Sequence, residues 1–208
     1  MPSESRFKQD DIIESAFRIV RQFGWEGLSA RSIAEELGSS TMPIYSSLKS
    51  MNSLEEEVVK RSFILMREYM HTERTNDQWL DFGLGYVLFA KEERNLFRCL
   101  HQERYIHLHE KFCFPQYQKN YQTLLKSPSF QAMSPDEQHW LAYTRYAFVY
   151  GIASLINVGL LSLSDMEIES YLRDIQMTLR NGMGHTKNYK YAYMGAVRKR
   201  NSAMGKDE

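Results

Sequence analysis

Two short helices around a glycine turn are the feature that most constrains this chain. Ser29 can cap a helix over 30–37, in which the apolar residues recur on one face. Gly38 supplies the positive φ that a tight helix end needs, and Ser40 can then cap a second helix over 41–48. This arrangement is typical of the helix-turn-helix, which reads DNA in the major groove.

The second helix divides its side chains between two faces. Pro43 fits only in its first turn, and Ile44 and Leu48 share the inward face. The outward face carries hydroxyls, a thioether and a cation, which suit phosphates and base edges: Thr41, Met42, Tyr45, Ser46 and Lys49. The alternative is that Tyr45 packs in the core and that the two serines only cap an arbitrary helix pair.

Residues around this motif resemble the signature of the tetracycline-repressor (TetR) family. The resemblance covers about a quarter of the chain, and several residues at fixed spacing make it more specific than a lone helix-turn-helix. The residues that carry it are Gly24-Trp25-Glu26-Gly27-Leu28-Ser29, Ile33-Ala34, Gly38, Ser40, Ile44-Tyr45 and Ser50.

The resemblance implies an all-α homodimer that regulates transcription. Its divisions would be a DNA-binding domain over 1–53, a connector helix over 54–71, an effector-binding and dimerisation domain over 72–184, and a basic tail over 185–208. The expected function is a repressor that a small-molecule effector releases from a palindromic double-stranded DNA operator. Two alternatives remain: a helical small-molecule-binding protein with a degenerate helix-turn-helix, and a DNA binder without an effector.

The resemblance also assigns roles to the DNA-binding residues. Arg31 would meet a phosphate or a base edge, the segment 41–43 would face bases, and Tyr45 and Lys49 would hold phosphates. Ser40 and Ser46 belong to the same predicted surface. The chain departs from the family at Ser47, Met51 and Met42, where an aromatic or His, a Lys and a small residue are frequent. The long Met42 side chain would reach into the groove, where it can touch a thymine methyl.

Charge alone does not indicate a nucleic-acid partner. The formal net charge is zero, and residues 1–53 hold six basic and seven acidic side chains. The basic groups would therefore have to gather on the DNA side, with the acidic groups on the far side.

Cysteine content and hydropathy point to a cytoplasmic protein. The chain has 2 cysteines, too few for a disulfide framework, and it opens with no charged and then apolar leader. The most apolar run, 147–161, is shorter than the ~20 residues that span a bilayer, so we expect a buried helix and no membrane partner.

Capping signals divide the remaining sequence into helices. Ser53 with Glu56, Ser134 with Pro135 and Glu137, and Ser164 with Glu167 each predict a helix start. The helices expected from these signals and from periodicity cover 11–23, 53–70, 77–91, 93–102, 106–125, 135–157 and 165–182.

In the family, the last two helices pair with their symmetry mates as a four-helix bundle. Small residues there would let the backbones approach closely, and the interface would be self-complementary. The residues expected at this interface are Gly151, Ser154, Leu155, Tyr171 and Ile175.

Aromatic residues concentrate in the helices that would surround a family effector pocket. Most must be ordinary core, but a subset could line a cavity for an apolar or aromatic small molecule, oriented by a polar group such as Arg145 or Asn157. The subset expected there is Phe82, Tyr86, Phe89, Tyr105, Phe112, Tyr117, Tyr121, Trp140, Tyr143 and Arg145.

A metal site is the weaker interpretation of the cluster of metal-ligating residues at 99–113. It holds imidazoles and thiols, but their spacing matches no strong metal motif, so we expect surface histidines and no metal. We find no phosphate loop, nucleophile elbow or acid pair, which argues against an enzyme and a cofactor. The basic tail over 185–208 is either solvated or a second DNA-contacting arm.

Overall fold

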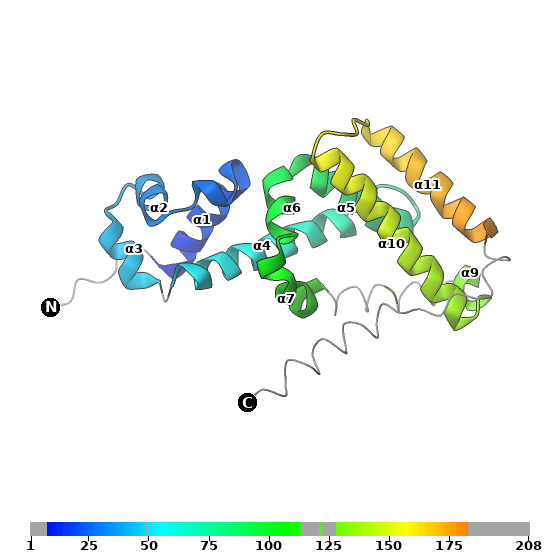
Figure 1. The fold of residues 1–208 in the computed structure, drawn as a ribbon, viewed down its shortest axis with the longest axis horizontal. Coiled ribbons are helices and arrows are strands. Elements are labelled where there is room, and N and C mark those ends of the chain that lie inside the picture. The colour runs from blue at the N-terminus through cyan, green and yellow to red at the C-terminus, as the bar shows by residue number, and fades with distance from the viewer. Residues whose placement is uncertain (1–7, 49, 114–120, 122–127, 183–208) are drawn as a thin grey trace, which may run out of the picture.

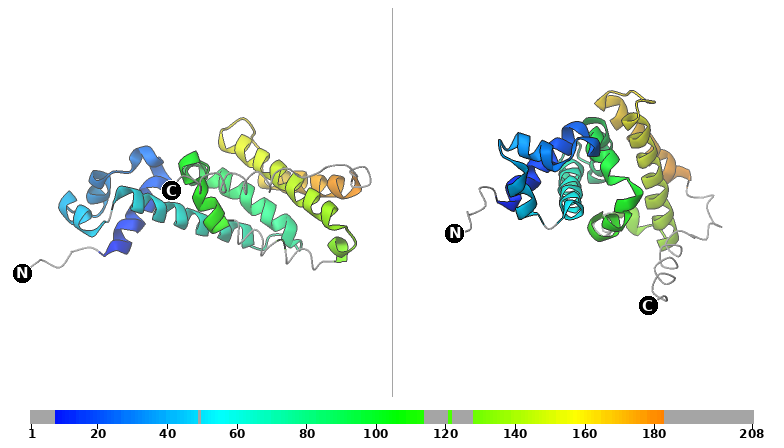
Figure 2. Two further views of the ribbon diagram at one scale, coloured as in Figure 1. Left: turned by 60° about the horizontal axis from the view of Figure 1, so that its bottom comes forward. Right: turned by 60° about the vertical axis from the view of Figure 1, so that its left-hand side comes forward.

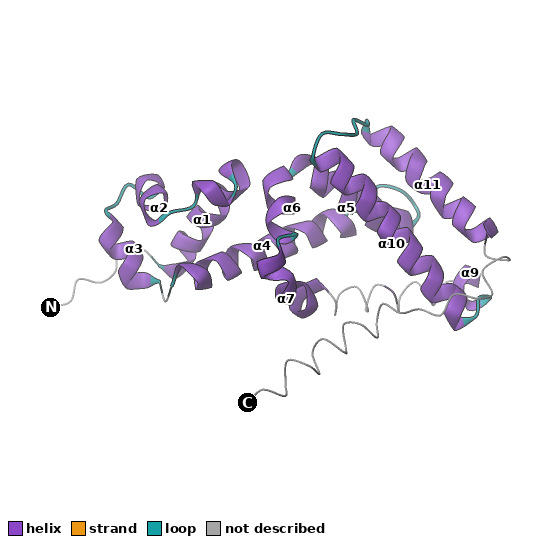
Figure 3. Ribbon diagram, in the orientation of Figure 1, coloured by secondary structure: helices purple, strands orange, loops and turns teal. Residues whose placement is uncertain are grey.

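The computed structural model describes residues 8–48, 50–113, 121 and 128–182 (Figure 1). Throughout these residues the regular elements are helices joined by turns and loops, and no strand occurs among them (Figure 3). The predicted all-α fold is confirmed.

The helices follow one another with short connections. The first elements are α1 (Gln9–Phe23), the 3-10 turn η1 (Trp25–Gly27), α2 (Ala30–Glu36), α3 (Thr41–Ser47), α4 (Met51–His71), α5 (Gln78–Glu92) and α6 (Arg94–Leu100). The later ones are the 3-10 turn η2 (Glu103–Tyr105), α7 (Ile106–Leu108), the π-helical turn η3 (His109–Cys113), α9 (Pro128–Gln131), α10 (Pro135–Asn157) and α11 (Asp165–Gly182).

The molecule is elongated, with α4 running between its two ends. Figure 1 shows α1, α2 and α3 at one end and α10 and α11 at the other, and both views in Figure 2 keep this separation. α4 packs against α1 on one side and against α5 on the other. The position of α3 relative to the C-terminal helices therefore depends on α4.

The core of the C-terminal part is built around α5. Its residues from Trp79 to Ala90 are all buried, because α5 packs against α4, α6, α10 and α11. A helix that is apolar on every side is stable in water only when neighbouring helices cover it. The sequence of α5, with aromatic or aliphatic residues on each face, thus requires this central position.

Gly85 allows α5 to approach the end of α4 at backbone distance. A Cβ added at this residue would lie 2.1 Å from the carbonyl oxygen of Tyr69 in α4, far inside van der Waals contact. Any side chain here would force the two helices apart, so the closeness of this packing depends on glycine.

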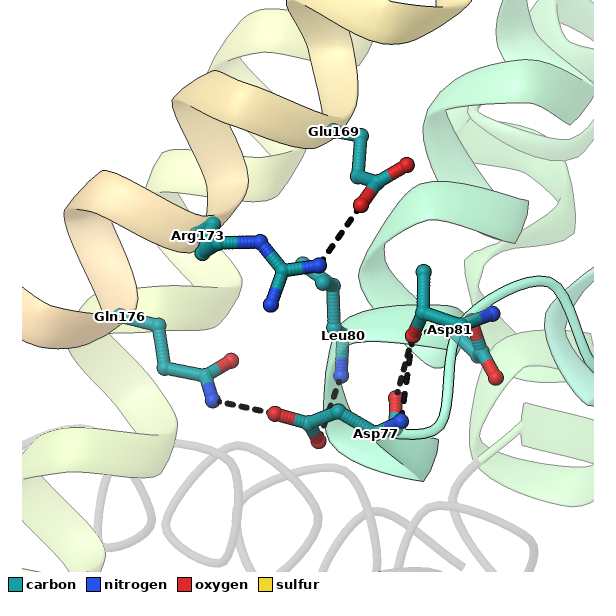
Figure 4. Close-up of polar contacts among 7 residues, drawn as sticks. Asp77, Leu80, Asp81, Glu169, Arg173 and Gln176 are labelled. Atoms are coloured by element: carbon teal, nitrogen blue, oxygen red, sulfur yellow. Dashed lines mark hydrogen bonds and ion pairs between the residues drawn. The ribbon is translucent and has the colours of Figure 1, made fainter.

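Polar contacts at the start of α5 join it to α11 (Figure 4). One Asp77 carboxylate oxygen accepts hydrogen bonds from two backbone N–H groups in the first turn of α5, and the other accepts from Nε2 of Gln176 at 2.8 Å. Asp81 is buried and accepts from the backbone N–H and the hydroxyl of Thr75, at 2.8 and 2.9 Å. The N-terminal end of α5 is thereby fixed to its preceding loop and to α11.

Two of the three predicted helix starts are confirmed. Ser134 and Ser164 form capping boxes with Glu137 and Glu167, each through a hydrogen bond in both directions. The start predicted at Ser53 is wrong. α4 begins at Met51, because the Ser50 hydroxyl accepts a hydrogen bond from the Ser53 N–H at 3.0 Å.

The middle of the chain is less regular than predicted. The helix expected over 93–102 ends at Leu100, and the one expected over 106–125 is α7 followed by the π-helical turn η3. The rest of that predicted helix, apart from residue 121, lies outside the described residues.

The run 147–161, which we expect to be a buried helix, is buried only in part, and α10 ends at Asn157. Ile152, Ala153 and Ile156 are buried, but Tyr150 and Leu155 on another side of α10 are exposed. α10 packs mainly against α5 and α11, and part of its surface stays uncovered. Among the described residues, no helix is both long enough and apolar enough to cross a membrane.

Replacing Gly85 by Ala should destabilise the protein by about 3 kcal/mol, because the added methyl group collides with backbone rather than with a movable side chain. Urea denaturation followed by circular dichroism measures this change in the free energy of unfolding. An unchanged denaturation midpoint would contradict the close approach of α4 and α5.

Candidate nucleic-acid interface

Reciprocal serine hydrogen bonds fix the start of α2. The Ser29 hydroxyl accepts from the Ser32 N–H at 3.0 Å, and the Ser32 hydroxyl oxygen accepts from the Ser29 N–H at 2.9 Å. Ser32 also donates its hydroxyl proton to the Gly27 carbonyl at 2.7 Å. Ser29 is therefore the N-cap that the sequence predicts, and the chain entering α2 has a defined direction.

A glycine turn ends α2 and directs the chain into α3. Gly38 has φ of 60°, its N–H donates to the Glu35 carbonyl, and the Ser39 N–H donates to the Ala34 carbonyl at 2.8 Å. This pair of hydrogen bonds is the Schellman arrangement, in which glycine takes the left-handed conformation at the helix end. The predicted role of Gly38 is confirmed.

α3 presents only one side to the core. Ile44 is fully buried, and Leu48 packs against the same core. Pro43 stands in the first turn, as predicted. Ser40 is at the N-cap position, as predicted. Its side chain makes no capping hydrogen bond, so the predicted hydrogen bond is wrong.

The other side of α3 is open to solvent. Met42 and Tyr45 are 79% and 66% exposed, and Thr41 and Ser46 are exposed as well. The alternative in which Tyr45 packs in the core is wrong. The structure therefore brings together four of the predicted DNA-binding residues on one short exposed helix, whereas Lys49 lies outside the described residues.

Basic side chains beside this surface are paired with acids. Arg31 on α2 donates from Nε to Oε1 of Glu35 at 2.8 Å, and this hydrogen bond raises the pKa of the guanidinium. Arg18 on α1 donates to Oε1 of Glu36 at 2.6 Å. Each of these two arginines therefore has a carboxylate of α2 beside it, whereas favourable attraction to DNA would require the basic groups to lie apart from the acidic ones.

Side chains of α6 and the residue before it hold the C-terminal end of α1. Arg21 donates from Nε to Oε2 of the buried Glu93 at 2.7 Å. Asn95 donates from Nδ2 to the carbonyl oxygens of Arg21 and Gln22, at 3.1 and 2.9 Å. These carbonyls belong to the last turn of α1, where they have no partner within the helix. α6 thus completes the hydrogen bonding of α1 and fixes its position.

A second contact joins η1 to α4 and η2. The rings of Trp25 and Tyr105 lie 5.3 Å apart, and the guanidinium of Arg104 lies 4.6 Å from the centre of the Tyr105 ring. The Tyr105 hydroxyl donates to Oε2 of Glu55 in α4 at 2.5 Å. Tyr105 is thus a packing residue at the junction, a role that its aromatic character alone did not reveal.

The residues predicted to line an effector pocket are spread over several sites. Phe82, Tyr86 and Phe89 are buried along α5, and Phe112 packs partly buried beside Phe63. Tyr121 and Trp140 pack at the far end of the molecule, around Trp79 and Phe130. Tyr143 is exposed on α10, and Tyr117 lies outside the described residues. The pocket itself stays a prediction.

The polar groups proposed for that pocket make structural contacts. Arg145 donates from Nη2 to the Trp79 carbonyl, and its guanidinium lies 4.9 Å from the centre of the Trp79 ring. Asn157 is buried and donates from Nδ2 to the carbonyl oxygens of Ala90 and Arg94, at 2.9 and 3.1 Å. Both side chains hold α10 against α5.

Two histidines lie in the aromatic core, which the sequence analysis missed. Nδ1 of His101 is 2.7 Å from the Phe97 carbonyl oxygen, and its Nε2 is 2.9 Å from the Tyr86 hydroxyl. The ring of Tyr150 lies 5.2 Å away, and that of His109 lies 5.4 Å away. Burial lowers the pKa of His101 to about 4 and also lowers that of His109. The spacing of Phe97 and His101, one helical turn, was the available signal.

No group of three His, Cys, Asp or Glu side chains suited to a metal ion occurs among the described residues. Cys99 is buried, which raises the pKa of its thiol to about 12 and disfavours the thiolate that binds metals. His107 is exposed, as expected for a surface histidine, whereas His101 and His109 are not.

The residues predicted for a dimer interface include several with open surface. A Cβ added at Gly151 would meet no atom within 4 Å, and Leu155 and Tyr171 are 44% and 53% exposed. Ser154 and Ile175 are half-buried. The interface remains a prediction, and this surface is open to a partner.

Comparison with solved structures shows the fold of a described regulator. The chain matches a crystal structure described as "the putative transcriptional regulator from Pseudomonas aeruginosa PAO1", with a TM-score of 0.63 and 15% sequence identity. The match covers 86% of this chain and 94% of that chain, so the two share a fold over most of their length. No protein-family model matches the sequence, and no curated protein matches it.

Acid should destabilise the protein through His101. Its pKa is about 4 in the folded protein and about 6.5 when unfolded, so the unfolded chain binds more protons between these values. The contribution of neutral His101 to the free energy of unfolding is therefore fully present above pH 6.5. As the pH falls to 5, the free energy of unfolding decreases by roughly 2 kcal/mol. Urea denaturation at pH 7 and pH 5 measures the difference.

His101→Gln, which cannot titrate, should lose much of this pH dependence, whereas the exposed His107→Gln should retain it. Equal pH dependence in wild type and His101→Gln would show that His101 is not buried as described.

Proposed function

We propose that this chain is a DNA-binding transcriptional regulator of the TetR type. The observation that carries the proposal is the exposed side of α3, where Thr41, Met42, Tyr45 and Ser46 stand beyond a helix pair fixed by a Schellman turn. A short helix held at the end of the molecule, with its outer side free, has the shape that enters a major groove.

Likeness to a protein described as a regulator supports the same class. The fold alone does not determine a function, so the proposal depends on the site rather than on the neighbour. The proposed divisions are a reading module over 1–53, a connector over 54–71 and a C-terminal helical body over 72–184. The helix α4, which would form the connector, begins at Met51. Residues 185–208 lie outside the described residues.

The proposed protein acts as a homodimer that binds a palindromic operator. Its interface is the exposed side of α10 and α11, where Leu155 and Tyr171 are uncovered and Gly151 lets a backbone approach. A dimer with two-fold symmetry places one α3 from each subunit on the same face of the duplex. Each α3 then binds one half-site of the palindrome.

Release by a small-molecule effector completes the proposal. The polar contact of Tyr86 with His101 lies in an aromatic core that reaches the surface at Tyr150. We propose that the effector, an aromatic or apolar molecule, binds among these rings. His101 directly follows α6, whose start holds α1 through Glu93 and Asn95. A ligand that shifts α6 would therefore move the reading helices, provided that it binds the two states with different affinity.

A second candidate function is small-molecule binding without DNA recognition. The ion pairs of Arg18 and Arg31 with acids of α2 favour it, because they weaken the attraction of this surface for phosphates.

Selection from random duplex DNA by the purified full chain at moderate salt separates the two functions. Sequencing of the bound pool should recover a palindrome. No enrichment by folded protein would overturn DNA reading and leave the small-molecule binder.

Tyr45→Phe should then weaken binding to the enriched duplex about threefold or more, because it removes a hydroxyl available to a phosphate. Tyr146→Phe makes the same change at an exposed tyrosine of α10 that is not among the residues proposed for the dimer interface, and it should not alter DNA affinity. Fluorescence anisotropy measures both. Equal losses for the two variants would contradict the role of Tyr45.

A further inference from the structure

We propose that α3 recognises thymine methyl groups, so that each operator half-site carries thymine under Met42. This inference depends on the proposed function, in which α3 enters the major groove. It goes further by naming the base, the chemical group on it and the side chain that reads it.

The composition of α3 excludes the usual readers of the other bases. Arg or Lys typically reads guanine, Asn or Gln reads adenine, and Asp or Glu accepts from cytosine. The seven residues Thr41–Ser47 include none of these types. The short helix that would face the bases therefore has no side chain that makes bidentate hydrogen bonds with a base edge.

The hydroxyl groups of α3 do not replace them. Ser46 donates its proton to the Pro43 carbonyl within the helix, at 3.0 Å, which leaves its oxygen only as an acceptor. Hydroxyls of Ser and Thr pair with several bases and so discriminate weakly. Specific reading by hydrogen bonds from this helix is therefore weak.

Apolar groups dominate the part of α3 that faces outward. Met42 is 79% exposed, Tyr45 follows it three residues later on the same side at 66% exposed, and Thr41 adds a methyl group. The C5 methyl of thymine is the apolar group that base pairs display in the major groove. Contact between it and the flexible Met42 thioether would remove both from water.

The neighbouring charges make this apolar contact more important. Arg31 is paired with Glu35, and Arg18 with Glu36, so these cations are partly neutralised before DNA arrives. Weaker phosphate attraction lowers the affinity for every sequence equally. A larger share of the affinity for the right sequence then comes from the methyl contacts.

Deoxyuridine provides the direct test, because it keeps the hydrogen-bonding groups of thymine and lacks only the methyl group. Each thymine of the selected operator is replaced in turn by deoxyuridine, and affinity for the full-length protein is measured by fluorescence anisotropy. At the position under Met42, we expect binding to weaken about fourfold for the lost methyl. Where the duplex carries cytosine at that position, replacing it by 5-methylcytosine should make the protein bind the duplex more tightly.

Two variants assign the effect to its side chain. Met42→Ala should bind the thymine and deoxyuridine duplexes equally at this position. Ile106→Ala removes an apolar side chain that is 64% exposed on α7, away from α3 and from the proposed dimer interface, and should keep the wild-type preference. Both changes are on exposed side chains, so circular dichroism should show an unaltered fold.

The outcomes separate this inference from the proposed function. A selected palindrome bound equally with thymine and with deoxyuridine throughout would overturn methyl recognition and leave DNA reading intact. A deoxyuridine effect that persists in Met42→Ala would overturn the assignment to Met42. If random duplex DNA yields no selected sequence, the proposed function fails and this inference falls with it.

Discussion

The close packing of α4 against α5 is the contact on which the rest of the molecule depends. α5 needs cover on all sides, and Gly85 lets α4 supply it at backbone distance. α4 also packs against α1, so the position of α1, α2 and α3 relative to the C-terminal helices depends on α4. Glu93 and Asn95 then add polar ties between α1 and the α6 region. The exposed α3 is therefore held by a continuous body of helices.

Local signals in the sequence predicted much of this fold. Ser29, Gly38 and Ser134 act as expected because capping and left-handed glycine depend on residues within one or two turns. The start of α4 was misplaced because Ser50 and Ser53, three residues apart, are both able to cap, and the structure uses the first. For His101 the sequence showed only its one-turn spacing from Phe97. Its other neighbours, Tyr86 in α5 and Tyr150 in α10, are distant in sequence and could not be predicted.

The candidate site shows the same division. Periodicity predicted which side of α3 is buried at Ile44 and which is exposed at Tyr45. It did not predict the partner of Arg18, since an ion pair between α1 and α2 requires the fold. Arg31 and Glu35 lie one helical turn apart within α2, a spacing that is visible in the sequence. Those pairs put a carboxylate beside each of these two cations, so the proposed DNA binding depends less on their attraction for phosphates.

Hydrogen exchange of the full chain, with and without the enriched duplex, tests most directly whether α3 is the reading helix. α3 is short and exposed on one side, so its amides should exchange quickly in the free protein. The account predicts that duplex DNA slows exchange in the segment 29–48 more than elsewhere. Protection confined to 135–182, with no change in 29–48, would contradict it and place the DNA, if bound, on a different surface.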